Sequence, residues 1–341
     1  MSTITWKRSV GFLVLGALLV VLLSGIYMAG GADESNSRAN FWRVVREGVQ
    51  GYTSVSSQGH HVLIQSGGEN WREIRNGLLI RFSPWVIAAV VTVLVLFYMI
   101  VGTDKLEKPR SGVLILRYRL WERILHWYTA VVFIIMALTG LSLLLGRIAL
   151  IPIFGHPIVS GYLEASKALH NLFGPLLLPG LLGEFIVWVR YNIPRKYDLQ
   201  WFKNMGGMLG GPRPHIGKVN AGEKGWFWLV FLFGIGVGIT GTLLDFPIWG
   251  QSRFTMQVSQ VIHATVAVLF VSASLGHIYM GTLGVEGVFE AMWTGSVDAV
   301  WAQQEHDLWY EEMMRERGKQ PDTEAGAGII VRDLRAGDHH G

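Results

Sequence analysis

The chain has 341 residues, of which 50% are hydrophobic and only 16% are charged, so it is more apolar than an ordinary soluble domain. The absence of cysteine excludes disulfides, thiolate metal sites, covalently attached haem and an iron–sulfur cluster held by this chain. The formal net charge of +4 does not indicate nucleic acid, because the basic residues lie in loops between apolar runs, as is typical of membrane topology.

Apolar runs along the chain predict an all-α fold, an integral membrane helical bundle. Each run is about as long as the roughly 20 residues that cross a bilayer core. The last four runs are expected to form the core bundle within 117–312, and the first two to add one or two N-terminal helices. The runs lie near 10–30, 84–102, 124–146, 168–189, 226–246 and 257–283.

The segment 1–32 has two interpretations. Lys7 and Arg8 precede its apolar run, and Gly30-Gly31-Ala32 could form a cleavage site, as in a secretory signal peptide. The run exceeds the usual signal core of about 7–15 residues, which favours a retained transmembrane helix. In both cases we expect 33–83 to lie on the outer, periplasmic side, where it helps to dock a partner.

Loop charges predict the orientation of the bundle. Lys and Arg are concentrated in 103–125 and 190–224. By the positive-inside rule these two loops and the C-terminus face the cytoplasm of a bacterial inner membrane. We expect 313–341 to form a flexible cytoplasmic tail. The opposite loops carry few basic residues: Arg147, Lys167 and Arg253.

Histidines in three of the last four predicted membrane segments are the candidate functional residues. His263 and His277 share one predicted helix, on which they lie about 21 Å apart along the axis and about 40° apart around it. His126 lies near the cytoplasmic start of its helix, and His170 near the outer start of the next one. Depth therefore pairs His126 with His277 at the inner level and His170 with His263 at the outer level.

Two histidine pairs at different depths match the axial ligands of two b-type haems. Two axial imidazoles leave no open position for oxygen chemistry, which favours electron transfer. Zinc is the alternative metal, but it binds about four converging ligands and each level supplies two. The alternative without a metal is a non-redox membrane anchor, whose histidines make interhelical hydrogen bonds.

Residues near these helices suggest further contacts. Of the arginines that precede His126 (Arg117, Arg119 and Arg123), we expect most to set the topology, and Arg117 and Arg123 are the candidates to pair with a haem propionate. The glycines at 234, 236, 238 and 241 make room either for a flat macrocycle or for close helix packing. We expect the remaining histidines to be solvated in loops or the tail: His60, His61, His156, His215, His306, His339 and His340.

Several further stretches of the chain are distinctive: RYRLWERILHWYTA, ALTGLSLL, ALHNLFGP, GKVNAGEKGWFW and IHATVAVLFVSASLGHIYM, which continues through WAQQEHDLWYEE. Together they resemble the gamma subunit of membrane-bound formate dehydrogenase, a dihaem cytochrome b. The resemblance runs from about 117 to 312, and the N-terminal part resembles the longer version of this subunit, in which an outer segment and the helix at 84–102 are extra. The NAGxK motif and the ending from GHIYM to HDLWY are more specific than paired histidines alone.

The resemblance implies a role in respiratory formate oxidation. Formate would be oxidised in a molybdenum- or tungsten-containing alpha subunit, and an iron–sulfur beta subunit on the outer face would pass the electrons to this chain. The chain would then carry them through two haem b groups to menaquinone or ubiquinone in the membrane lipid. The alternative is a dihaem cytochrome b that serves a hydrogenase or another molybdoenzyme. No catalytic residue is expected in this chain itself.

The resemblance also implies that Asn220 and Gly222 contact the quinone beside His277. A carboxamide can hydrogen-bond a quinone carbonyl, and a glycine lets the ring approach the backbone. The alternative for Asn220 is a cap on the helix that follows it.

Overall fold

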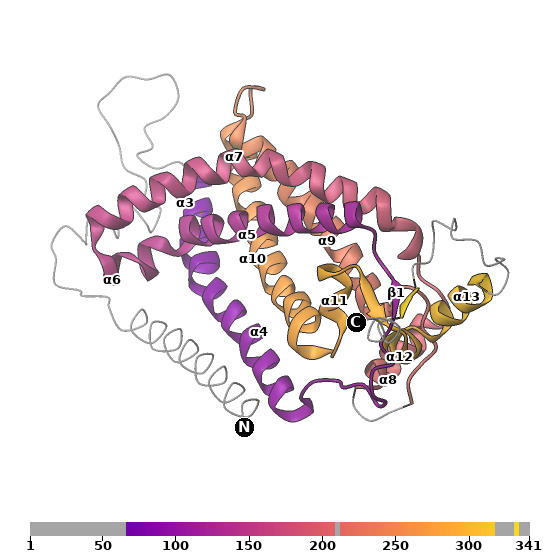
Figure 1. The fold of residues 1–341 in the computed structure, drawn as a ribbon. Coiled ribbons are helices and arrows are strands. Elements are labelled where there is room, and N and C mark those ends of the chain that lie inside the picture. Colours follow the sequence, from indigo (N-terminus) through magenta and orange to yellow (C-terminus); the bar gives the residue numbers. More distant parts are fainter. Residues whose placement is uncertain (1–65, 209–211, 318–330, 334–341) are drawn as a thin grey trace, which may run out of the picture. The chain divides into compact units, whose positions relative to one another are not determined.

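The computed structural model describes residues 66–208, 212–317 and 331–333, and long α-helices make up most of them (Figure 1). The helix α3 (Ser66–Arg72) continues through a π-helical turn (Glu73–Leu79) into α4. The long helices are α4 (Ile80–Val101), α5 (Leu120–Ala149), α7 (His156–Trp188), α9 (Ala221–Asp245) and α10 (Arg253–Tyr279). The short ones are α6 (Ile151–Phe154), α8 (Asp198–Asn204), α11 (Val288–Trp293), α12 (Ala299–Glu305) and α13 (Asp307–Arg317).

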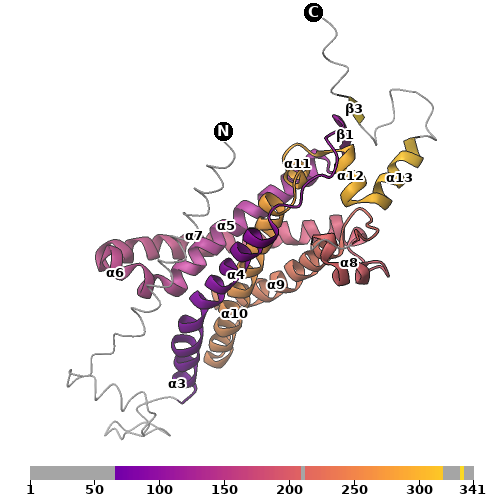
Figure 2. The same ribbon diagram turned by 90° about the horizontal axis from the view of Figure 1, so that it is seen from below.

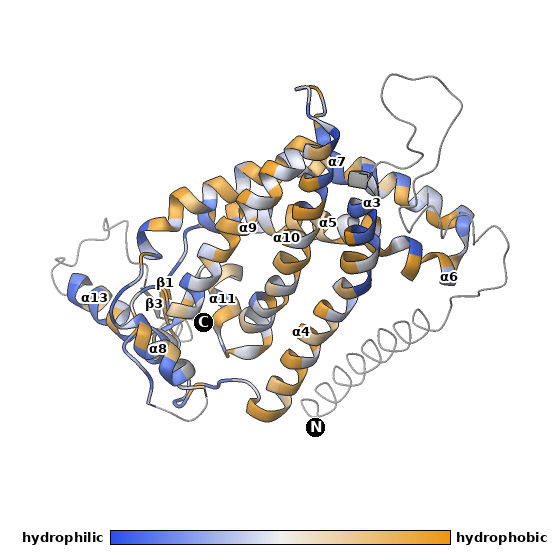
Figure 3. Ribbon diagram, turned by 180° about the vertical axis from the view of Figure 1, so that it is seen from behind, coloured by the Kyte–Doolittle hydropathy of each residue, from blue (hydrophilic) through white to orange (hydrophobic). Residues whose placement is uncertain are grey.

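The long helices confirm the last five predicted membrane segments, while the run at 10–30 lies outside the described residues. Each is long and apolar enough to cross a membrane, and Figure 3 shows apolar residues along most of their length. The chain is therefore a multi-pass membrane protein. The five candidate spans are Asn70–Val101, Leu120–Ala149, His156–Tyr191, Ala221–Asp245 and Arg253–Gly284.

The helix before the core bundle begins earlier than the apolar run at 84–102 predicts. The residues from Asn70 to Asn76, most of them polar, form α-helical and then π-helical turns ahead of the apolar part. Pro84 lies inside α4, where the preceding Ser83 donates a hydrogen bond to the Leu79 carbonyl. Hydropathy marks the lipid-facing part of a helix and not its ends, which explains the difference.

The chain divides into two compact units, and each of the five long helices contributes part of its length to both. The first unit comprises 1–92, 135–175 and 235–272. The second comprises 93–134, 176–234 and 273–341. His170 and His263 thus belong to the first unit, and His126 and His277 to the second.

A small antiparallel sheet in the second unit adds to the expected all-α fold. Its strand order is β2-β1-β3, and Ile115 of β1 is paired with Val297 of β2. Figure 2 shows β1 and β3 beside α12 and α13. Ile115, Val297, Trp301 and Trp309 are buried together and form the core beneath the sheet. The strands are β1 (Val113–Leu116), β2 (Ser296–Asp298) and β3 (Val331–Asp333).

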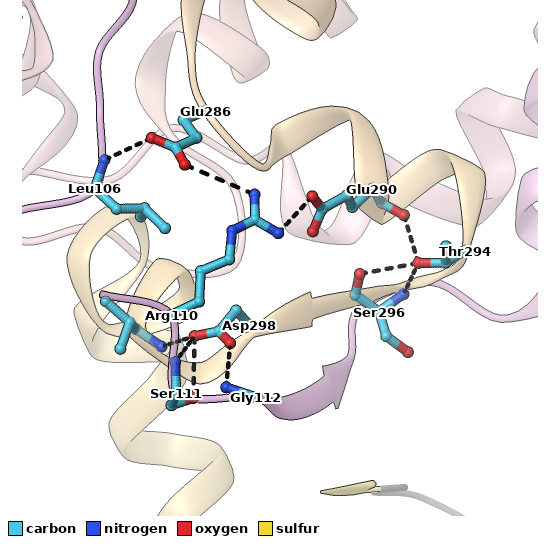
Figure 4. A network of polar contacts seen from close by, with 10 residues as sticks. Leu106, Arg110, Ser111, Gly112, Glu286, Glu290, Thr294, Ser296 and Asp298 are labelled. Atoms are coloured by element: carbon cyan, nitrogen blue, oxygen red, sulfur yellow. Dashed lines mark hydrogen bonds and ion pairs between the residues drawn. The ribbon is translucent and has the colours of Figure 1, made fainter. Parts of the chain in front are cut away.

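Polar contacts join the chain segment before β1 to the segment around β2 (Figure 4). The Asp298 carboxylate accepts hydrogen bonds from the backbone N–H groups of Ser111, Gly112 and Val300, so it also caps α12. Arg110 pairs with Glu290 at 2.6 Å. These contacts fix the sheet to the helices that follow α10.

The last helix and β3 extend order into the segment 313–341 that was expected to be a flexible tail. The helix α13 runs to Arg317, and its start is held because the Asp307 carboxylate accepts a 2.7 Å hydrogen bond from the Ile216 N–H. The strand β3 pairs with β1. The other residues of this segment lie outside the described part of the chain.

His306 is buried, which corrects the expectation that it is solvated. It is 1% exposed, lies between the rings of Trp301 and Trp309, and its Nδ1 donates to the Gly217 carbonyl at 2.7 Å. The aromatic residues around it build a core that a loop position in the sequence does not reveal. His156 and His215 are exposed, as expected. His60, His61, His339 and His340 lie outside the described residues.

Candidate functional site

In the first unit, the structure brings together the histidines that were expected to pair at the outer level. His170 on α7 and His263 on α10 have ring centroids 6.2 Å apart, with their planes at 83°. They lie on different helices, and the two rings are arranged edge to face. The predicted pairing of these two residues therefore has a matching geometry.

Each of these two rings lies against a Thr-Gly pair of a neighbouring helix. Thr139 Oγ1 is 2.9 Å from His170 Nδ1, and Thr240 Oγ1 is 3.1 Å from His263 Nδ1. The glycine that follows each threonine has no side chain that would collide with the imidazole ring. A Cβ atom on Gly140 would lie 3.0 Å from His170 Cε1, and one on Gly241 would lie 3.1 Å from His263 Cε1. The glycines thus let each imidazole pack directly against a helix backbone.

In the second unit, His126 on α5 and His277 on α10 form the other pair. Their ring centroids are 6.1 Å apart, with their planes at 71°. His126 Nδ1 is 3.6 Å from a carboxylate oxygen of Glu184 on α7. The His277 ring stacks on the indole of Trp226 from α9. This pair therefore has the same spacing as the first one but different supporting residues.

Both spacings fit two imidazoles bound to one metal ion. A metal–imidazole bond is about 2.0–2.1 Å long in zinc sites, so two imidazole nitrogens bound to one metal ion lie at most about 4 Å apart. The ring centroid lies roughly 1 Å behind each nitrogen, so the centroids are about 6 Å apart. Among the described residues, no group of three or more His, Cys, Asp or Glu could hold a metal ion. The donor sets thus suit the axial positions of a haem better than a zinc site.

Asn220 caps α9, which is the alternative considered for it. Its side-chain Oδ1 accepts a hydrogen bond from the Glu223 N–H at 2.8 Å, and the Glu223 carboxylate accepts one from the Asn220 N–H at 2.8 Å. This reciprocal arrangement is a capping box. The Asn220 Nδ2 makes no hydrogen bond to any described residue, so the amide still has a free donor.

Gly222 follows the cap and packs against Trp201 of α8. A Cβ atom on Gly222 would lie 2.6 Å from the Trp201 Cη2 atom, so only a glycine allows this contact. Trp201 thus occupies the space directly beside Gly222. The predicted approach of a quinone to Gly222 stays a prediction.

The two arginines expected near a propionate have protein partners. Arg117 is buried, and its Nη2 donates to Glu223 Oε1 and to the Lys218 carbonyl, while its Nε and Nη1 have no partner among the described residues. Arg123 Nη1 donates to the Trp293 carbonyl at 2.6 Å. These contacts leave the predicted propionate pairing of either arginine untested.

Sequence reasoning missed Thr139, Thr240, Glu184 and Trp226. The two threonines carry a signal, because ALTGL and GITGT repeat a Thr-Gly pair inside apolar runs. Glu184 is also visible as a carboxylate within an apolar run, and such residues default to a functional hypothesis. Nothing in the sequence distinguishes Trp226 from the other tryptophans.

Comparisons with known proteins cover the region that contains both histidine pairs. The family model of prokaryotic cytochrome b561 matches residues 117–295. The chain is 31% identical over 218 residues to the Escherichia coli K12 protein named formate dehydrogenase, nitrate-inducible, cytochrome b556(Fdn) subunit, a match that covers 62% of this chain and 97% of the relative.

Two further relatives carry similar names. The chain is 29% identical over 206 residues to the Escherichia coli K12 formate dehydrogenase, cytochrome b556(fdo) subunit, covering 59% of this chain and 94% of the relative. It is 28% identical over 208 residues to the Haemophilus influenzae formate dehydrogenase, cytochrome b556 subunit, covering 58% and 83%. More than a third of the present chain lies outside each match.

Proposed function

The chain belongs to the prokaryotic cytochrome b561 family, and from this premise we propose that it is the membrane cytochrome b subunit of a formate dehydrogenase. In this role it transfers electrons from a periplasmic iron–sulfur subunit to a quinone. The names of its relatives support the formate dehydrogenase assignment. Membership of the family implies haem b as the cofactor.

We propose that the chain holds two haem b groups, and the observation that carries this proposal is the common spacing of the two histidine pairs. The pair His170 and His263 has a centroid separation of 6.2 Å, and the pair His126 and His277 one of 6.1 Å. When bound, a haem supplies a one-electron couple between ferric and ferrous iron. The two histidines of each pair would hold one haem iron, and the apolar helices around the sites would limit the access of water.

We further propose that the quinone binds near the start of α9, on the side of the His126 and His277 pair. Asn220 and Trp226 lie on this same stretch of α9, and Trp226 stacks on His277. The free Asn220 Nδ2 is oriented by the capping bonds of its Oδ1, and it can donate to a quinone carbonyl. Gly222 would then shape the quinone site, either through its contact with Trp201 or by contact with the quinone itself.

The proposed surroundings follow from the loop charges. The basic loops 103–125 and 190–224 belong largely to the second unit, which we place at the cytoplasmic side of a bacterial inner membrane together with the C-terminus. The segment 33–83 would then face the periplasm and help to dock the iron–sulfur subunit and, through it, the molybdenum- or tungsten-containing catalytic subunit. Quinone protons would come from the cytoplasm.

Purification of the intact complex tests this function. We expect two haem b per chain in a pyridine haemochrome assay, co-purification of the iron–sulfur and catalytic subunits, and reduction of both haems by formate. Reduction by hydrogen and not by formate would favour a hydrogenase subunit instead. A complex without haem absorption would contradict the cytochrome assignment.

A further inference from the structure

One arrangement of side chains occurs twice in the first unit. On α5, Thr139 and Gly140 face His170 of α7, and on α9, Thr240 and Gly241 face His263 of α10. In both cases the threonine hydroxyl meets the Nδ1 atom and the glycine meets the Cε1 atom. The two histidines of one pair are therefore held in the same way by two different helices.

The other hydrogen bonds of the two threonines indicate whether the threonine Oγ1 or the histidine Nδ1 is the donor in each threonine–histidine contact. Thr139 Oγ1 donates to the Ile135 carbonyl at 2.7 Å, and Thr240 Oγ1 donates to the Gly236 carbonyl at 2.6 Å. A hydroxyl has one proton, and a carbonyl can only accept. Since that proton is used within the helix, each threonine oxygen acts as the acceptor toward its histidine.

The histidine must then donate from Nδ1. A neutral imidazole has one N–H group, so a protonated Nδ1 leaves Nε2 with a free lone pair. Metal-bound histidines commonly have their other nitrogen bonded to an acceptor, which fixes the tautomer and ring orientation and makes the ligand more basic. The threonines supply this type of contact, and the Met136 carbonyl for His170 and the Val237 carbonyl for His263 are second acceptors beside them.

We propose that Thr139 and Thr240 are positioning residues that hold His170 and His263 in the Nδ1–H tautomer and present both Nε2 atoms to one haem iron. This inference rests on the proposed haem-binding function. More basic axial ligands stabilise ferric over ferrous iron, so the two threonines lower the midpoint potential of this haem.

The effect is specific to one haem, because the other pair is supported differently. His126 lies near the Glu184 carboxylate, and His277 stacks on Trp226. No hydrogen bond joins either of these rings to a threonine among the described residues. Removal of a threonine hydroxyl should therefore change the potential of one haem and leave the other unchanged.

Redox titration of the purified complex tests the proposal, with Thr139→Val and Thr240→Val as the main variants. Valine has nearly the same shape as threonine but lacks the hydroxyl. We expect each variant to raise the midpoint potential of the haem held by His170 and His263. The expected shift is about 59 mV, which corresponds to a tenfold change in the ratio of oxidised to reduced haem. Tenfold is the lower end of the effects that the loss of such supporting contacts has on metal sites.

Two other threonines are matched controls. Thr129 on α5 donates to the Leu125 carbonyl, and Thr242 on α9 donates to the Gly238 carbonyl, but neither bonds a histidine within the described part of the chain. Thr129→Val and Thr242→Val should retain the wild-type potential of the haem held by His170 and His263. Thr139→Ser and Thr240→Ser keep the hydroxyl and should retain it as well.

The outcomes separate positioning from packing. Unchanged potentials in both Thr139→Val and Thr240→Val would overturn the proposal, as would equal shifts in the control variants. If a valine variant loses this haem, retention in the matching serine and control variants supports the proposal, and loss in those variants overturns it. The wild-type haem content is measured in parallel, so a failure of the proposed function appears separately as a complex without two haems.

Discussion

The indole of Trp226 and the imidazole of His277 are stacked, with ring centroids 4.7 Å apart and planes only 9° from parallel. Trp226 lies on α9 within two helical turns of Asn220, which caps that helix. The stack therefore links the start of α9 to the pair His126 and His277. It also restricts the rotation of one of the two rings in the pair.

Replacement of Trp226 should weaken the haem site formed by His126 and His277. A stacked aromatic pair contributes about 0.5–1.5 kcal/mol beyond its buried area, so Trp226→Leu should lower haem affinity by roughly two- to tenfold. Trp226→Phe keeps an aromatic face and should lose less. Haem transfer to apomyoglobin, followed for each haem band, measures this. Equal retention of both haems in Trp226→Leu would show that the stack has no role in holding His277.

Two variants of Asn220 separate its capping role from the proposed quinone contact. Asp is as good a helix cap as Asn but lacks the Nδ2 donor. Asn220→Asp should therefore keep the thermal stability while slowing haem reoxidation by quinone about tenfold, the effect of one lost hydrogen bond of about 1.4 kcal/mol. Stopped-flow measurement of formate-reduced complex gives this rate.

Asn220→Leu is the companion variant, because it removes both the cap and the donor. It should slow reoxidation and also destabilise the start of α9 by about 1 kcal/mol. A wild-type reoxidation rate in Asn220→Asp would mean that Asn220 is only a cap.

The buried His306 should make stability depend on pH. Burial and the nearby Arg117 lower the pKa of His306 well below its usual value. The unfolded chain binds this proton below about pH 6.5, whereas the native state does not, so stability falls as the pH decreases. The contribution lost between pH 7.5 and 5 is about 2 kcal/mol while the native ring stays neutral.

Hydrogen exchange at several pH values, used to measure the stability of the α12 and α13 region, tests this prediction. His306→Asn keeps a donor near the position of Nδ1 but does not titrate, so its pH dependence should be weaker. His215 is the control, because Asp307 raises the pKa of this exposed ring, and its small contribution is lost as the pH rises. The same pH dependence in His306→Asn and the wild type would contradict the explanation.

Features that depend on periodicity and hydropathy were predictable from the sequence. The spans from α4 to α10 follow from the apolar runs, and the pairing of His170 with His263 follows from their predicted depth. The depth of a residue in the membrane follows from its position along a predicted span, so it can be inferred from the sequence. The ends of the helices were less predictable, because the polar turns before Pro84 have no hydropathy signal.

Features that depend on the packing of side chains were not predictable. The contact between Thr139 and His170 requires the rotation of α5 and α7 about their own axes, which a sequence does not give. His306 looks like a loop residue until Trp301 and Trp309 close around it. The sequence indicated both the cap and the quinone contact for Asn220, but only the structure shows that Oδ1 serves the cap and leaves Nδ2 available.

The central claim is that the chain ligates two haems, one with His170 and His263 and the other with His126 and His277. The most direct measurement is the resolved haem spectrum of the purified complex with each of these histidines replaced by alanine. His170→Ala and His263→Ala should remove the same haem and leave the other spectrally intact, while His126→Ala and His277→Ala should remove only that other haem. Loss of the same haem in variants from different pairs, or two intact haems in any of the four, would contradict the claim.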